Sequence, residues 1–73
     1  MSTDGGTTYE AHVLGERRSD GTWGGWLEFR PIGKSGRTLR TAYETTQPDR
    51  AALDYWAGGL EPVYLEGALE RAD

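Results

Sequence analysis

The chain contains no cysteine and a single histidine, His12. The lack of cysteine excludes disulfides, and one histidine is too few for a structural zinc site, which takes four Cys or His ligands. Basic residues are also scarce: eight Lys and Arg stand against twelve Asp and Glu, and the net charge of −4 disfavours sequence-independent binding to nucleic acid. No apolar run approaches the ~20 residues of a membrane span, and the first residues lack a signal-peptide pattern. We therefore expect a cytoplasmic protein without membrane contact.

The 73 residues are enough for one domain, and 36% of them are hydrophobic. A core of this size rarely supplies more than about 3–5 kcal/mol by itself. The remaining sources of stability are the bulky aromatic residues (three Trp, four Tyr and one Phe) and self-association.

Charge is distributed unevenly along the chain. Residues 17–40 hold six basic and two acidic residues, a net charge of +4, whereas residues 41–73 hold two basic and seven acidic residues, a net charge of −5. The simplest interpretation is that the two segments neutralise each other within one fold.

Residues 1–7 are polar and predict a flexible tail, followed by a single domain over 8–73. Alternating apolar and polar residues predict strands over 8–17, 22–31, 37–45 and 62–69. A helix is predicted between the third and fourth strands. Thr46 is its expected cap, Pro48 and Asp49 suit its first turn, and Gly58-Gly59 is expected to end it.

This β-β-β-α-β order predicts an α+β fold. The helix is long enough to cross the sheet, so the fourth strand is expected to pair with the first in a four-stranded antiparallel sheet. A more strongly curled sheet of this order resembles, in outline, a small SH3-like half-barrel, and both architectures stay open at this point. Folds of this kind carry many functions, so the outline transfers no functional residue.

The register of the first hairpin decides which side chains share a face. If Asp20-Gly21 is a two-residue turn, Val13 lies opposite Glu28, and both faces mix apolar with charged residues. One extra residue, accommodated by a bulge at Gly24-Gly25, instead pairs Val13 with Phe29.

That bulge would turn Trp23 and Trp26 to the outer face together, with Arg18 and Arg40 at its edges and Arg40 opposite Glu28. Trp and Arg are enriched among the residues that dominate protein interfaces. We therefore predict a partner-binding surface made of Trp23, Trp26, Arg18 and Arg40. The competing interpretation places the two indoles in the core.

These features favour a non-enzymatic interaction module that binds a partner protein or a second copy of itself. The alternative function is single-stranded nucleic-acid binding, with bases stacked on the same aromatic and basic face. A carbohydrate-binding or enzymatic role has no specific support: His12 has no nucleophile pattern around it, and Glu66 and Glu70 suit a solvated strand face. The glycine loop at 33–36 lacks the spacing of a phosphate loop, and no cofactor is expected.

Overall fold

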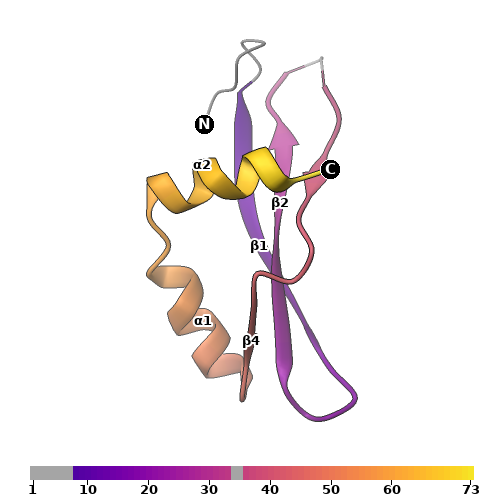
Figure 1. Cartoon of the computed structure of the whole chain (residues 1–73), viewed down its shortest axis with the longest axis vertical. Helices are drawn as coiled ribbons and strands as arrows, with labels where there is room; N and C mark the ends of the chain where they lie inside the picture. Colours follow the sequence, from indigo (N-terminus) through magenta and orange to yellow (C-terminus); the bar gives the residue numbers. More distant parts are fainter. Residues whose placement is uncertain (1–7, 34–35) are drawn as a thin grey trace.

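The computed structural model describes residues 8–33 and 36–73; the predicted tail, residues 1–7, and part of the predicted loop lie outside this range. The described chain forms an antiparallel sheet with two helices packed on one face (Figure 1). In chain order the elements are β1 (Tyr9–Arg17), β2 (Trp23–Pro31), β3 (Leu39–Arg40), β4 (Thr45–Gln47), α1 (Arg50–Gly58) and α2 (Pro62–Arg71).

β2 is the central strand of the sheet. β1 pairs along one side of it, and β3 and β4 follow one another along the other side, all antiparallel. The prediction of a four-stranded antiparallel sheet is confirmed, but the predicted pairing of a fourth strand with the first is wrong. In the described part of the chain, the outer side of β1 has no strand beside it, so the sheet is open.

The Arg18 N–H donates to the Thr22 carbonyl at 2.7 Å just beyond the ends of β1 and β2, so the hairpin has a three-residue loop, Ser19-Asp20-Gly21, rather than the predicted two-residue turn. The Gly21 N–H donates to the Arg18 carbonyl at 3.0 Å, and Gly21 takes a φ of 88°, which glycine adopts without strain. Asp20 stabilises the loop by accepting hydrogen bonds from the Thr22 backbone N–H at 2.9 Å and from its hydroxyl at 2.6 Å.

This loop changes the register by one residue and removes the need for a bulge. Val13 pairs with Leu27 rather than with Phe29, and the pairing is continuous from Tyr9 to Arg17. The predicted bulge at Gly24-Gly25 is therefore wrong. A three-residue loop already places apolar residues opposite apolar residues, because it keeps the odd-numbered positions of both strands on one face.

Glycines at the middle of the hairpin instead allow α1 to approach closely. Gly15 and Gly25 are cross-strand partners beneath Leu53 of α1. A Cβ at Gly15 would lie 2.4 Å from Leu53 Cδ2, and one at Gly25 would lie 2.6 Å from Leu53 Cδ1. The absence of side chains at these two glycines therefore leaves the space that the buried Leu53 side chain fills.

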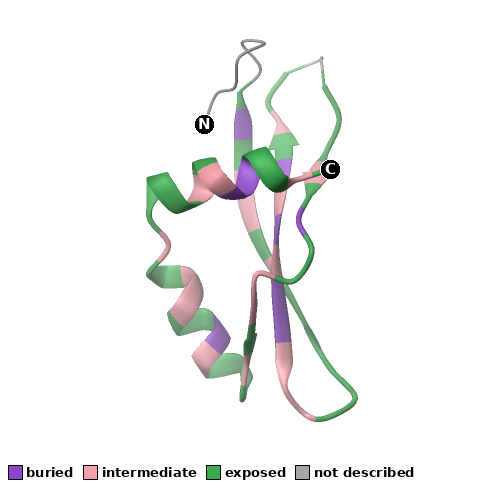
Figure 2. Ribbon diagram, in the orientation of Figure 1, coloured by how far each residue is buried: buried purple, intermediate pink, exposed green. Residues whose placement is uncertain are grey.

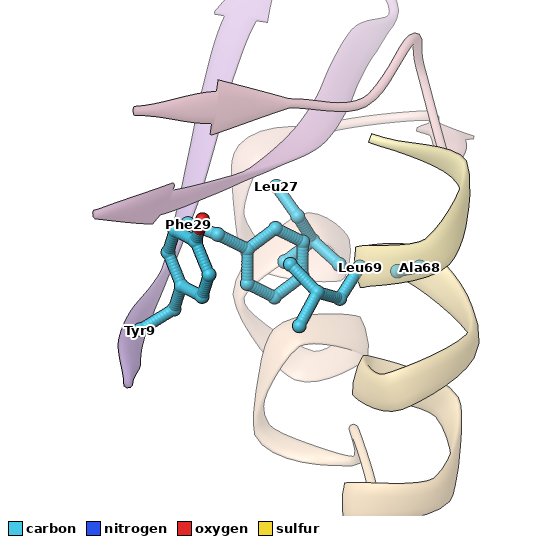
Figure 3. Packing of buried hydrophobic residues seen from close by; sticks show 5 residues of the cluster. All are labelled: Tyr9, Leu27, Phe29, Ala68 and Leu69. Atoms are coloured by element: carbon cyan, nitrogen blue, oxygen red, sulfur yellow. The ribbon is translucent and has the colours of Figure 1, made fainter. Parts of the chain in front are cut away.

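The core lies at the other end of the sheet, between β2 and α2 (Figure 3). Leu27 and Phe29 are fully buried, and they pack with Tyr9 of β1 and with Ala68 and Leu69 of α2. Figure 2 shows a run of buried positions on β2 and single buried stretches on β1, α1 and α2. Burial of these side chains fixes α2 across the hairpin.

The α1 helix begins one turn later than its predicted cap. Asp49, not Thr46, is the N-cap, and its carboxylate accepts a hydrogen bond from the Ala52 N–H at 2.8 Å. Thr46 lies instead in β4 and pairs with Gly24. The end of the helix is as predicted, with Gly58 its last residue and Gly59 the C-cap.

The segment predicted as the last strand is a helix, α2. Leu65, Ala68, Leu69 and Ala72 all contact or belong to the core, at a spacing of three and four residues that only a helix places on one side. Pro62 occupies the first turn, where its missing N–H costs nothing. The observed order is thus four strands followed by two helices, rather than β-β-β-α-β with one helix.

Candidate functional site

The two tryptophans of the predicted surface lie on opposite faces of the sheet. Because β2 is regular, Trp23 shares a face with Leu27 under the helices, and Trp26 points to the face that carries no helix. Trp23 lines a cleft of about 450 Å³ with Leu53 and Arg50 of α1. The predicted paired orientation of Trp23 and Trp26 is therefore wrong, and it fails with the bulge on which it rested.

The open face nevertheless assembles three of the four predicted residues, together with a fourth that was not predicted. The Arg18 guanidinium carbon lies 5.7 Å from the ring centre of Tyr43, and the Tyr43 and Trp26 ring centres are 6.1 Å apart. The Arg40 guanidinium carbon lies 5.1 Å from the centre of the Trp26 ring. We call Arg18, Tyr43, Trp26 and Arg40 the Arg–aromatic row.

Tyr43 reaches this face because the chain loops out between β3 and β4. Glu28 of β2 pairs with Arg40, and Gly25 of β2 pairs with Thr45. The chain therefore advances five residues from Arg40 to Thr45 beside a stretch of β2 that advances only three. The two extra residues form a local excursion that carries Tyr43 over the open face.

Thr41 keeps the chain hydrogen-bonded to β2 at the start of this excursion. Its N–H donates to the Leu27 carbonyl at 3.0 Å, and its hydroxyl oxygen accepts from the Leu27 N–H at 3.1 Å. The hydroxyl thus replaces the carbonyl that a regular strand would present, which explains why this polar residue is buried in the described structure.

Tyr43 lies flat on the strand because Gly24 has no side chain. A Cβ at Gly24 would lie 2.7 Å from Cζ of Tyr43, closer than side chains approach. The Tyr43 hydroxyl donates a hydrogen bond to the Glu16 carboxylate of β1. This hydrogen bond favours the protonated phenol and raises the pKa of Tyr43 above its usual value of 10.0. Strand, glycine and carboxylate together hold the ring in the row.

The two arginines of the row differ in their other partners. Arg18 lies 3.8 Å from the Asp20 carboxylate in the hairpin loop. Arg40 exchanges two backbone hydrogen bonds of 3.0 Å with Asp73, which fixes β3, and it is opposite Glu28 as predicted. Within the described residues, no carboxylate lies within ion-pair distance of the Arg40 guanidinium.

The rest of the open face carries both signs of charge. Glu28 forms an ion pair with Arg30 at 3.3 Å, and Glu10 lies 2.6 Å from Nε2 of His12. Carboxylates therefore alternate with the arginines across the face. A surface of this kind is mixed in charge rather than uniformly basic.

The sequence pattern concealed Tyr43. Treated as one continuous strand, residues 37–45 place Tyr43 on the same face as Leu39 and Thr41, which is the core face. Gly24 was the available signal, because a strand position without a side chain leaves room for a ring from a neighbouring strand.

The described residues include no cluster of three metal-binding His, Asp or Glu side chains, and no helix among them is long and apolar enough to cross a membrane. No protein-family model matches the chain, and comparisons with curated proteins and with solved structures find no significant match. The described chain is a small antiparallel sheet with two helices on one face and the Arg–aromatic row on the other.

Proposed function

We propose that this chain is a non-enzymatic protein-interaction module that binds its partner through the Arg–aromatic row. The observation that carries the proposal is an aromatic pair flanked by two arginines on the sheet face that carries no helix. Aromatic and arginine side chains dominate the binding energy of many interfaces. Tyr43 is 44% exposed, so a partner could contact its ring directly.

Arg40 gives the surface its chemical preference. A guanidinium that lies over an aromatic ring keeps its N–H donors for a carboxylate, and within the described residues Arg40 has no carboxylate partner. An Asp or Glu of the partner protein would fill this role. The acidic segment 41–73 of a second copy, with its net charge of −5, is one source of such a carboxylate.

Single-stranded nucleic acid remains the second candidate for this face. The aromatic pair with flanking arginines suits base stacking. The carboxylates of Glu16 and Glu28, which lie among the arginines, repel a phosphate backbone. The mixed charge of the face therefore favours a protein partner.

A photo-crosslinking amino acid at position 43 tests the proposal, with the same group at Ile32 as the control. Both positions are exposed, but Ile32 lies outside the row. We expect protein adducts from position 43 in cells that express the full chain, and we expect Arg40→Glu to remove them while Arg50→Glu on α1 leaves them. An adduct with the mass of two chains identifies self-association, and a nuclease-sensitive adduct identifies nucleic acid. Adducts that are unaffected by Arg40→Glu, or that form equally from position 32, refute the proposal.

A further inference from the structure

An apolar surface lies on the other side of the molecule, in the angle between the two helices. Figure 1 shows α1 and α2 diverging from the short connection that joins them. A groove of about 930 Å³ opens between them. It is lined by Gln47, Ala52, Tyr55, Trp56, Gly59, Leu60, Glu61, Val63 and Tyr64. We call this the interhelix groove.

Two aromatic residues of the interhelix groove, Trp56 and Tyr64, are held in place by the fold. The rings of Trp56 and Tyr64 meet edge to face, with centres 6.3 Å apart and planes at 89°. The Tyr64 hydroxyl donates to the Glu44 carboxylate at 2.6 Å, and Arg71 lies over the Tyr64 ring at 5.9 Å. The groove therefore exists before any ligand binds, which lowers the entropic cost of binding.

Two large side chains of the groove wall lie outside the core and are largely exposed. Tyr55 is 88% exposed and Val63 is 72% exposed, and neither belongs to the core cluster. A groove of this volume with a predominantly apolar lining has the size and character of ligand and peptide sites. Burial of these two residues against a partner would remove a large apolar area from water.

We propose that the interhelix groove binds a basic amphipathic segment of a partner protein, with apolar side chains in the groove and Lys or Arg at its rim. Glu61 is the one charged residue among those that line the groove in the described part of the chain. The segment 41–73, which contains both helices, has a net charge of −5. Charge complementarity therefore selects a cationic occupant, in the manner of an amphipathic helix in an apolar groove.

A second copy of this chain is a poorer occupant than a basic segment. A twofold contact through the groove would place the same patch on both sides and would bring the two Glu61 rims together. It would also bring together two segments that each carry a charge of −5. This repulsion is absent when the partner is basic.

The test uses the full chain and two synthetic helical peptides of about 16 residues, or about 24 Å of helix. Both peptides carry leucine at one helical face; one carries lysine and the other glutamate at the remaining positions. Binding is measured by fluorescence anisotropy of the labelled peptide at several salt concentrations. Tyr55→Ser, Val63→Ser and Glu61→Gln change the groove, and Ile32→Ser is the control for loss of an exposed apolar residue elsewhere.

We expect the lysine peptide to bind about tenfold or more tightly than the glutamate peptide, with an affinity that falls as salt rises. Tyr55→Ser and Val63→Ser should each weaken binding by about tenfold, and Glu61→Gln by about threefold, while Ile32→Ser has no effect. Equal binding of the two peptides, or unchanged binding to Tyr55→Ser and Val63→Ser, overturns the proposal. The proposal is also overturned if sedimentation shows that the same two substitutions dissociate a homodimer. The result is independent of the Arg–aromatic row, whose variants are not used.

Discussion

The adjacent glycines of β2 give the sharpest test of how the two faces are built. Gly24 faces Tyr43 on the open side, and Gly25 faces Leu53 on the helix side. In Gly25→Ala the new Cβ would lie 2.6 Å from Leu53 Cδ1, so this buried leucine must move by about 0.8 Å to reach the 3.4 Å of ordinary contact. Overpacking of this kind costs about 1–3 kcal/mol, and the stiffer unfolded chain returns about 0.4–1 kcal/mol.

Gly24→Ala makes a clash of similar size, because the new Cβ would lie 2.7 Å from Cζ of Tyr43. This ring is partly exposed, however, and it lifts into solvent without moving the core. The contact with Trp26 that it loses is worth about 0.5–1.5 kcal/mol, which the unfolded-state gain largely offsets. We therefore expect Gly25→Ala to destabilise by about 1–2 kcal/mol and Gly24→Ala to change stability by less than about 1 kcal/mol.

Thermal and urea unfolding of the two variants measure this difference. A loss of 1 kcal/mol lowers the Tm of a domain of this size by about 4–8 °C. Gly58→Ala is the matched control, because nothing lies within 4 Å of its Cβ position and alanine is the better helix former. If Gly24→Ala is the more destabilising of the two, the assignment of the faces is refuted.

Three further predictions follow from single contacts. Phe29→Ala removes a fully buried ring and should cost about 3–5 kcal/mol, which leaves the chain largely unfolded by circular dichroism. Asp49→Ala should cost about 1 kcal/mol in urea unfolding through loss of the α1 cap, whereas an equal effect of Thr46→Ala would contradict the assigned cap. The raised pKa of Tyr43 means that its stabilising contribution is complete below pH 10.0 and is lost as the pH rises through the higher folded value. Glu16→Gln should therefore lower the pKa of Tyr43 in an absorbance titration of tyrosinate, and an unchanged titration would dismiss the hydrogen bond.

Local signals were sufficient for the elements whose pattern has one interpretation. The β1–β2 hairpin follows from strict alternation around Asp20-Gly21, and Gly58-Gly59 ends a helix as expected. The opposition of Arg40 and Glu28 was also correct. This prediction was not affected by the error at Gly24-Gly25, because it depends on the pairing of β2 with β3 and not on the hairpin turn.

The errors arose where two patterns fit the same residues. Asp20-Gly21 suits both a two-residue turn and a three-residue loop. The two-residue turn needs a bulge at Gly24-Gly25 to pair apolar residues with one another, and only that bulge would place Trp23 and Trp26 on one face. In α2, Leu65 and Leu69 fit a strand as well as a helix. Ala68 settles the matter only once its contact with the core is known.

Tyr43 and the interhelix groove required tertiary structure. The excursion that presents Tyr43 is stabilised by the Thr41 hydroxyl, which bonds to Leu27, a residue 14 positions away. The interhelix groove depends on α2, a segment whose residue pattern predicted a strand. Such placements are decided by packing between distant segments rather than by local preference.

A nuclear Overhauser spectrum of the full chain tests most directly whether the open face is built as described. We expect cross-peaks from the Tyr43 ring to the Gly24 α-protons and to the Trp26 indole, and from Leu53 methyl groups to Gly15 and Gly25. Cross-peaks between the indoles of Trp23 and Trp26, with none from Tyr43 to Gly24, would contradict this arrangement.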